Sequence, residues 1–356
     1  MTKTYRPRMD KREYLAWQAF KESDFVVDQL SLLKEECDKA GIPMKDVRHY
    51  WYKSKVFSIF AKNKVKGYEE VKDQVVKQMK AYSPQYEPIV RETVQDPHLL
   101  VIDPSDIHIG KLAVASETGE EYTVNKAVNM AKEGVRGILQ YASGFDIDQI
   151  LFVVGNDALH IDHPHRKTTA GTPQDTDGMW HTAFHAAKDM YIELIEMLMP
   201  LADVHVLYCP SNHDYTHGYF LADTLGSWFR KSENVTFDIN IRHRKYFKYG
   251  LNMIEADHGD GCKTKDTPQL MAYESPEMWS QCKYRYSYKH HLHHKVKLGS
   301  IVEMGVDGIG VNIEFLRSPS ASDGWHDRNG YKSMKSVEGF IHSKTKGRVA
   351  SLSYNY

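Results

Sequence analysis

The sequence predicts an α/β protein with a sheet-on-sheet core and helices outside. Short apolar runs typical of buried strands recur after residue 98, and longer amphipathic segments typical of helices separate them. Toward the C-terminus the helical segments thin out, and apolar and polar residues alternate as they do in antiparallel strands. These three observations favour a second sheet, or a mixed one, over a single parallel sheet.

The elements follow in order along the chain. Helical apolar spacing at 25–41 stops at Gly41, and a second short helical pattern covers 44–53. The pattern of apolar residues then changes near 83–88 and again at 96–98, which predicts a small, mainly helical domain at 1–95 and a larger one at 96–356. In the larger domain the expected strands are 99–103, 150–155, 204–209 and 253–258, the expected helices are 124–142 and 179–199, and the alternating segments are 300–317, 336–343 and 348–356.

Composition limits the class of protein. Hydrophobic residues make up 41% of the 356 residues, enough for a sizeable core. The net charge is −1, but the first 98 residues carry 19 Lys and Arg against 15 Asp and Glu. The four cysteines show no CxxC pair, which favours reduced thiols. We find no signal-peptide pattern and no membrane-spanning run, so we expect a cytoplasmic protein with no membrane partner.

Ligand-capable side chains follow nearly every expected core strand. In α/β folds the carboxyl ends of strands carry the chemistry, and imidazole and carboxylate groups are common metal ligands. Each cluster alone is a good turn or helix-cap signal, but five clusters in order are hard to explain as independent turns. The clusters are Asp106-Ile-His108, Asn156-Asp157, Asn212-His213-Asp214, Asp257-His258-Gly259 and the run KHHLHHK at 289–295.

This series resembles the calcineurin-like metallophosphoesterases over roughly residues 99–310. Their motifs run D-x-H, G-D, G-N-H-D/E, a histidine before glycine, and G-H-x-H. The opening SDIHIGK at 105–111 is especially similar to that of SbcD-type DNA nucleases and of phage-encoded phosphoesterases. Three departures stand out: Asn156 intervenes between Gly155 and Asp157, and Ser211 and His290 occupy glycine positions of the family.

The resemblance implies a four-layer αββα sandwich of two mixed sheets around two divalent metal ions. Asp157 is expected to bridge them, because a carboxylate offsets two cations better than an amide, with Asn156 as the alternative. In an extended last motif, alternation places His291 and His293 on one face and His290 and His294 on the other. The implied ligands are Asp106, His108, Asp157 and His293 for one metal, and Asp157, Asn212, His258 and His291 for the other.

The implied reaction is hydrolysis of a phosphate ester by a metal-bridging hydroxide. His213 is expected to protonate the leaving oxygen as general acid, and Asp214 to orient it and raise its pKa. Mixed His, Asp and Asn ligands suit Mn best, with Fe, Zn or Mg as alternatives. Between the second and third motifs, His160 and Arg166 are candidate ligands of a substrate phosphate. The alternative is that this segment is an ordinary polar loop that leads into a helix.

The substrate stays open between classes. Residues 45–66 carry seven Lys and Arg, one acidic residue and five aromatic residues, which favours a nucleic-acid module, and the two short helices allow a helix-turn-helix. A phosphodiesterase or nuclease acting on DNA or RNA is therefore the first hypothesis. The alternatives are a phosphatase or phosphodiesterase for a nucleotide or other small molecule, and a metal-bound scaffold without activity. A homo-oligomer is compatible with each.

Overall fold

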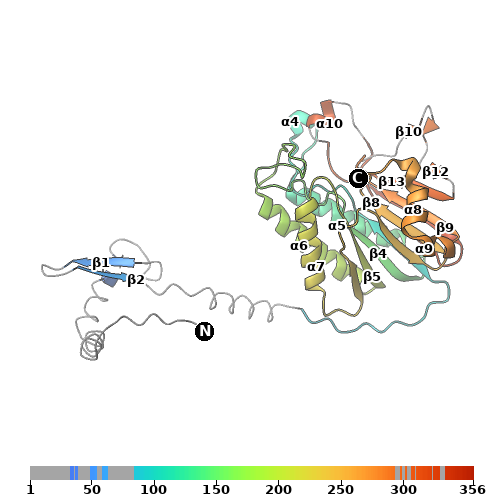
Figure 1. Cartoon of the computed structure of the whole chain (residues 1–356), viewed down its shortest axis with the longest axis horizontal. Helices are drawn as coiled ribbons and strands as arrows, with labels where there is room; N and C mark the ends of the chain where they lie inside the picture. Colours follow the sequence, from blue (N-terminus) through green and yellow to red (C-terminus); the bar gives the residue numbers. More distant parts are fainter. Residues whose placement is uncertain are drawn as a thin grey trace. The chain divides into compact units, whose positions relative to one another are not determined.

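The computed structural model describes residues 33–35, 37–38, 49–53, 58–62, 84–292, 297–298, 301–302, 306–308, 310–322, 324–328 and 333–356. The chain divides into two compact units, Met1–Ser83 and Pro84–Tyr356. Figure 1 shows the elements of the second unit, with two sheets and helices beside them. Among the described residues, no helix combines the length and apolar character that a membrane crossing needs.

In the first unit, one expected element is wrong. Residues 33–35 and 37–38 are helical, but His49–Lys53, expected at the end of a second helix, forms strand β1. It pairs antiparallel with β2, Ser58–Lys62, with Trp51 opposite Phe60. Consecutive aromatic residues favour a pleated strand over a helix, which explains the error. The helix-turn-helix interpretation therefore loses the end of its second helix.

The larger sheet of the second unit has six strands in the order β15-β14-β3-β4-β5-β6. Strands β3 to β6 run parallel, while β14 lies antiparallel to both β3 and β15. The three central strands coincide with the first three apolar runs of the sequence, so those predictions are confirmed. The bounds are β3 His98–Asp103, β4 Ile147–Gly155, β5 Asp203–Cys209, β6 Val235–Asp238, β14 Ser336–Ser343 and β15 Gly347–Asn355.

The smaller sheet has five strands in the order β12-β13-β9-β8-β7. It is mixed too: β8 and β9 are parallel, whereas β7 pairs antiparallel with β8 and β12 pairs antiparallel with β13. In the alternating segment 300–317, which is expected to be antiparallel, β12 and β13 do pair antiparallel, and β13 also runs parallel to β9. The bounds are β7 Lys245–Tyr249, β8 Asn252–Asp257, β9 Tyr284–Lys289, β12 Val306–Gly308 and β13 Val311–Phe315, with a separate pair β10 Lys297–Leu298 and β11 Ile301–Val302.

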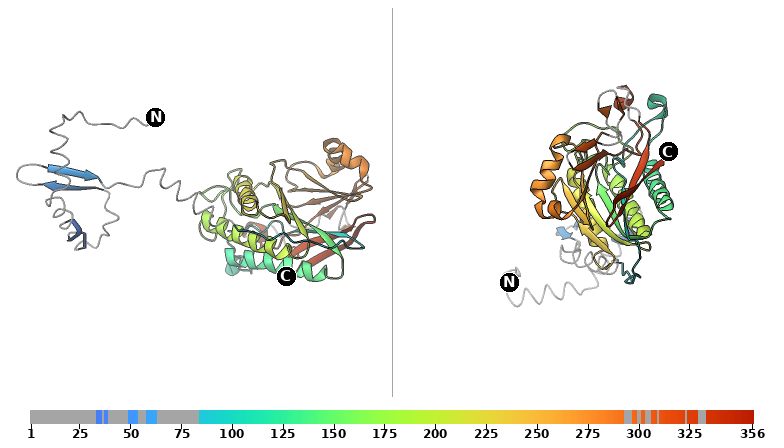
Figure 2. Two further views of the ribbon diagram at one scale, coloured as in Figure 1. Left: turned by 90° about the horizontal axis from the view of Figure 1, so that it is seen from below. Right: turned by 90° about the vertical axis from the view of Figure 1, so that its right-hand side faces the viewer.

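Helices lie against the outer faces of the sheets, and Figure 2 shows the strands between the green and the orange helices. The first group packs on the six-stranded sheet and the second on the five-stranded sheet, where Met271 of α8 contacts the cluster around Met253. The bounds are α4 Ala115–Thr118, α5 Val124–Tyr141, α6 Trp180–Leu198, α7 Tyr215–Trp228, η2 Thr264–Asp266, α8 Thr267–Glu274, α9 Pro276–Gln281 and α10 Gly324–Arg328.

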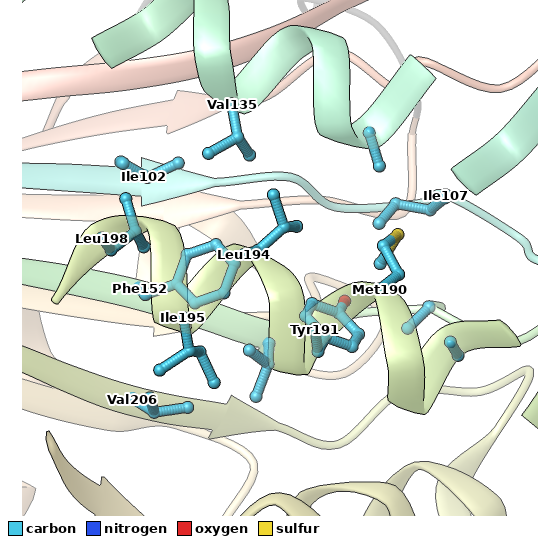
Figure 3. Close-up of a cluster of buried hydrophobic side chains, with 14 of the residues drawn as sticks. Ile102, Ile107, Val135, Phe152, Met190, Tyr191, Leu194, Ile195, Leu198 and Val206 are labelled. Carbon is cyan, nitrogen blue, oxygen red and sulfur yellow. The ribbon is translucent and has the colours of Figure 1, made fainter. Parts of the chain in front are cut away.

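Two apolar layers flank the six-stranded sheet. Even-numbered β3 residues such as Ile102 face the helices, where they join Phe152 and the α6 residues Tyr191 and Leu194 (Figure 3). Odd-numbered residues face the other way and form a layer with Ile254, Tyr288 and other residues of the five-stranded sheet. Period-two alternation in one strand thus supplies both cores. The α/β class and the two mixed sheets are confirmed.

Helix α5 approaches the sheet very closely because two of its interior residues are glycines. A Cβ atom added at Gly134 would lie 2.4 Å from Val337, and one at Gly137 would lie 2.0 Å from the ring of Tyr354. Glycine is unfavourable inside a helix, so its presence here reflects this contact with β14 and β15. The packing fixes the sheet whose strand ends carry the site.

Candidate metal centre

The predicted site residues come together where the strands end. The segment after β3 runs beside the segment after β4: Asp106 N donates to the Asn156 carbonyl at 2.7 Å and His108 N to the Asp157 carbonyl at 2.9 Å. Asn156 N in turn donates to the carbonyl of Cys209, the last residue of β5. Parallel strands place their carboxyl ends at one edge, so motifs that are distant in sequence become neighbours.

The backbone at this edge takes a left-handed conformation that residues other than glycine rarely adopt. Of the six non-glycine residues with positive φ in the described part of the chain, five belong to these motifs: Asp106, His108, Asn156, Asp157 and His291. Such residues cost of order 1–3 kcal/mol each and persist only where the surroundings hold them. The concentration of left-handed residues distinguishes this edge from the rest of the described chain.

Three groups of side chains could each hold a metal ion, because the ligand atoms within each group all lie within 4.8 Å of one another. Asp157 belongs to two of these groups, and His108 also belongs to two. The His258 Nε2 atom lies 3.1 Å from Asp157 Oδ2 and 2.8 Å from Asn212 Oδ1, which adds Asn212 to the second group. The groups are Asp106–His108–Asp157, Asp157–His258–His291 and His108–His160–His213.

Asp157, and not Asn156, lies at the centre of this arrangement. Its Oδ1 accepts a hydrogen bond from His213 N at 2.9 Å, and its Oδ2 faces His258. Asn156 is buried, and neither atom of its side-chain amide has a hydrogen-bond partner among the described residues. Asp157 is the carboxylate that two of the ligand groups share.

The glycine before these residues is required by a close approach. Gly155 has φ +89°, and a Cβ atom there would lie 2.3 Å from the carbonyl oxygen of Cys209. Only glycine allows β5 to pass so near the turn while the chain reverses into Asn156. This contact helps to fix the position of Asp157.

The charged groups at the centre shift the pKa values of one another. Burial works to raise the pKa of Asp157, but His258 and His213 hold it well below its usual range. Burial works against the imidazolium of His258, yet Asp157 and Asp106 raise its pKa to about 9. Burial lowers the pKa of His291, and nearby His258 lowers it further. The proton on His258 thus supplies positive charge beside Asp157, the charge that a bound cation would otherwise supply.

His213 is oriented by a backbone carbonyl. Its Nδ1 lies 2.9 Å from the His160 carbonyl oxygen, and because a carbonyl only accepts, Nδ1 carries the proton of this hydrogen bond. Its ring stacks on His160 with centroids 5.3 Å apart and meets the edge of His108 at 4.6 Å. Nε2 is therefore the ring nitrogen of His213 that this hydrogen bond leaves available.

Asp214 takes a different position from the one its expected role requires. Its carboxylate accepts hydrogen bonds from Ser211 Oγ at 2.6 Å and from Leu159 N at 2.8 Å. Burial and the charge of Asp157 raise the pKa of Asp214 to about 7. Since the His160 carbonyl takes up Nδ1 of His213, Asp214 contacts the loops around the site and not that imidazole.

Ser211 is a site residue that sequence reasoning missed. Its hydroxyl accepts from Asp157 N at 2.7 Å and donates to Asp214, so it links the turn after β4 to the turn after β5. The signal was present, because serine stands where the family has glycine. Backbone geometry explains the glycine, whereas only a hydroxyl forms this pair of hydrogen bonds.

The two candidate substrate residues lie in different places. His160 is buried in the third ligand group, with Nδ1 3.3 Å from Nδ1 of His108. Arg166 lies on an exposed turn, where its N donates to the His163 carbonyl. That loop is attached to the start of α7, because Asp162 accepts from Thr216 N at 3.0 Å and from His217 N at 2.7 Å.

The histidine run does not continue as an extended strand. β9 ends at Lys289, and His291 has φ +69°, so the alternation expected for the run does not hold at His291. His291 lies half-buried in the second group, whereas His290 is fully buried and faces Asp103. His293 and His294 lie outside the described residues, so the fourth ligand expected for the first metal stays a prediction.

Comparison with known proteins gives no family. No family model and no curated protein match the chain. A solved structure of a single mutant of Vps29 from Entamoeba histolytica is similar over 73% of this chain and 99% of its own, with 12% identity and a TM-score of 0.28. A double mutant of the same protein covers 43% and 82%, with 12% identity and a TM-score of 0.22. Likeness this low supports no statement about function.

Proposed function

We propose that the chain is a metallophosphoesterase of the calcineurin-like type that hydrolyses phosphate esters with two divalent metal ions. The observation that carries the proposal is the position of Asp157, a buried carboxylate shared between two ligand groups. The order of helices, sheet, sheet and helices supports the four-layer αββα sandwich that the motifs imply.

The residues present fit a pair of cations. Asp157 Oδ2 and His258 Nδ1 are buried and have no hydrogen-bond partner among the described residues, although Oδ2 faces His258 Nε2. Mixed imidazole, carboxylate and amide donors suit Mn, Fe or Zn. Bound cations would supply Lewis acidity and a water acidic enough to attack phosphorus at neutral pH. The proposed ligands are Asp106, His108, Asp157 and His293 for one ion and Asp157, Asn212, His258 and His291 for the other.

The remaining residues act on the substrate and on the loops. Protonated on both nitrogens, His213 would give the Nε2 proton to the leaving oxygen, while the His160 carbonyl holds its Nδ1. His160 would donate to a phosphoryl oxygen. Asp214 would act through Ser211, because its carboxylate fixes the turn that presents Asp157. We thus propose a positioning role for Asp214.

Metal content and hydrolysis of model esters test the proposal together. The wild type should contain close to two metal ions and hydrolyse bis-p-nitrophenyl phosphate with Mn²⁺ present. His213→Ala should keep the metals and lose most of this activity. His185→Ala, which removes an exposed histidine of α6, is the matched control and should behave as wild type. If the wild type binds no metal, or turns over neither the diester nor p-nitrophenyl phosphate, the proposal is wrong and a scaffold is favoured.

We further propose that the substrate is a nucleic acid, or a nucleotide diester. His217 lies one helical turn after His213, and its Nδ1 contacts the Ile161 carbonyl at 3.2 Å, next to the carbonyl that holds His213. The indole of Trp180, 38% exposed, stacks on His217 with centroids 5.4 Å apart and planes within 10°. A partly exposed indole that stacks on His217 suits a base.

Positive charge supports the same substrate. The exposed turn after Asp162 carries His163, His165, Arg166 and Lys167. Thr169 Oγ1 donates to Asp162 at 3.0 Å, and its backbone N donates to the Asn212 carbonyl at 3.2 Å, so the base of this loop is attached to a proposed metal ligand. Nucleic-acid binding by residues 45–66, a homo-oligomer and, from the four free cysteines, a cytoplasmic location remain further parts of the proposal.

Trp180→Ala tests the base-stacking part. Loss of one stacked base costs about 1–3 kcal/mol, so KM for thymidine 5′-p-nitrophenyl phosphate should rise about fivefold to a hundredfold. Turnover of bis-p-nitrophenyl phosphate, which has no base, should be unchanged. Tyr273→Ala, which removes an 85% exposed aromatic ring from α8, is the control. Equal effects on both substrates, or no effect on either, would contradict a base-stacking role.

A further inference from the structure

Two buried side chains outside the proposed ligand set meet directly beneath the site. Asp103 is the last residue of β3 in the six-stranded sheet, and His290 follows the last residue of β9 in the five-stranded sheet. Their exposed fractions are 1% and 0%, and His290 Nε2 lies 3.2 Å from Asp103 Oδ2. This contact therefore joins the two sheets at the edge that carries the metal centre.

Each partner stands next to a proposed ligand that has strained backbone. His290 precedes His291, at φ +69°, and Asp103 lies three residues before Asp106, at φ +51°. The two strained segments also touch, because His291 N donates to Asp106 Oδ2 at 3.3 Å. Left-handed residues hold only where the neighbouring structure fixes them, so what fixes residues 103 and 290 bears on both ligands.

The main chain at His290 is fixed on both sides. Its N donates to the His258 carbonyl at 3.2 Å, and its carbonyl accepts from Leu292 N at 2.8 Å. A Cβ atom at Gly259 would lie 3.1 Å from the His290 carbonyl oxygen, so the two loops pack in close contact. The main chain of His290 thus links the loop of His291 to the loop of His258.

The chemistry of the pair argues against simple packing. Neither oxygen of Asp103 and neither nitrogen of His290 has a hydrogen bond among the described residues, so their mutual contact is the polar contact that each side chain makes. A buried polar pair with so few hydrogen bonds stabilises a fold less than apolar side chains of similar size would. The resembling family has glycine at this position, and glycine would leave Asp103 facing an apolar layer.

We infer that Asp103 and His290 form a positioning pair that sets Asp106 and His291 for cation binding. The inference rests on the proposed metal centre. The pair joins the two sheets beside the loops that carry Asp106 and His291. Without it, these two loops lose a fixed contact between β3 and β9, although no proposed ligand atom is removed.

The test compares Mn²⁺ affinity with thermal stability in two matched variants of the full chain. His290→Gln removes the imidazole beneath the site. His342→Gln removes another fully buried imidazole, one that reaches the same interface from β14 and bonds to the Tyr288 hydroxyl at 2.9 Å. Titration calorimetry after metal removal should show Mn²⁺ binding weakened by about tenfold to a hundredfold in His290→Gln and unchanged in His342→Gln.

The unfolding temperatures of the metal-free proteins show how much packing each variant loses. Both variants should unfold at a lower temperature than the wild type, and only His290→Gln should also lose Mn²⁺ affinity. Asp103→Asn should weaken Mn²⁺ binding as His290→Gln does, and it tests the inference even where His290→Gln does not fold. The double variant should be no weaker than the weaker single one, because the two residues act as a unit.

Two results would overturn the inference. One is Mn²⁺ affinity in both His290→Gln and Asp103→Asn equal to that of His342→Gln. The other is multiplication of the two losses in the double variant, which would mean independent roles. A wild type that binds no Mn²⁺ overturns the proposed metal centre itself and the inference with it, and this outcome is recognised before any variant is made.

Discussion

The two ends of the interface between the sheets are built differently. At the end away from the site, the Asn252 amide is bonded through its nitrogen: Nδ2 donates to the carbonyls of Tyr249 at 2.9 Å and Ser343 at 2.8 Å, although Oδ1 has no partner among the described residues. At the site end, the Asn156 amide has no hydrogen-bond partner among the described residues. All six left-handed non-glycine residues of the described chain lie in the site motifs or in the loop that carries Arg166.

The difference separates residues that stabilise from residues that bind. Buried polar groups are normally paired, and departures cluster where function needs an unsatisfied donor or acceptor. At the far end the Asn252 Oδ1 atom departs from this rule, whereas at the site end both amide atoms of Asn156 and both ring nitrogens of His290 do. We therefore expect substitutions at the site end to remove binding and activity with modest loss of stability, and substitutions at the far end to do the reverse.

The largest expected effect is that of Asp157→Asn. A neutral amide keeps the shape but no longer offsets the charge of two cations, so kcat should fall by about a thousandfold or more. The measurement is kcat for bis-p-nitrophenyl phosphate together with metal content. Asp148→Asn is the matched control at the far end, where the carboxylate accepts from the Tyr249 hydroxyl at 2.6 Å. Full metal content in Asp157→Asn would remove the basis for the comparison.

Next in size is His258→Ala, which should lower the metal content from two ions to one. His258 belongs to the group with His291, and the group Asp106–His108–Asp157 is left intact. Elemental analysis after dialysis measures the ratio. Loss of both metals would show that the two groups do not bind independently, and retention of both would exclude His258 as a ligand.

A smaller effect, on stability alone, is expected for Asn252→Ala. Two buried carbonyls lose their donor, so the free energy of unfolding should fall by about 2–3 kcal/mol, with Mn²⁺ affinity unchanged. Chemical denaturation of the metal-free protein measures it. Asn156→Gly is the counterpart at the site end: it removes an amide without hydrogen bonds at a left-handed position that glycine tolerates. It should cost much less, and retention of both metals would leave Asp157 as the bridging group.

Sequence reasoning found what depends on short-range pattern. The apolar runs of β3, β4, β5 and β8 can be recognised because strands buried on both faces form short continuous apolar runs, and the motifs after them can be recognised because few residue types bind metals. The N-terminal unit shows the limit of such prediction. The sequence at 49–53 is compatible with a helix and with an aromatic strand, and its pairing with 58–62 selects the strand.

Long-range contacts were beyond reach for the same reason. Nothing near His290 indicates that its ring meets Asp103, and nothing near Asp214 indicates that Ser211 takes its carboxylate while a backbone carbonyl orients His213. These contacts depend on which strand ends adjoin. Motif order identified the residue types, and only the fold assigns each to a partner.

The smallest effect at neutral pH is that of His342→Gln, yet its pH dependence is distinctive. Burial, together with the positive charge of Arg348, lowers the pKa of His342 to about 3. Below its ordinary value of 6.5, the unfolded chain takes up a proton that the folded chain does not, so stability falls as pH drops from about 6.5 toward about 3. Above that window the imidazole is neutral in both states and contributes no pH dependence.

At pH 7.5 the variant should lose about 1 kcal/mol, the net value of one hydrogen bond to Tyr288. As the pH falls, the wild type should lose stability faster than the variant, by at most about 1.4 kcal/mol for each pH unit. Denaturation of the two metal-free proteins between pH 4 and 7.5 measures the difference, in which contributions of shared carboxylates cancel. Parallel curves would mean that His342 is protonated in the fold, and the far end would then hold a buried charge as the site end does.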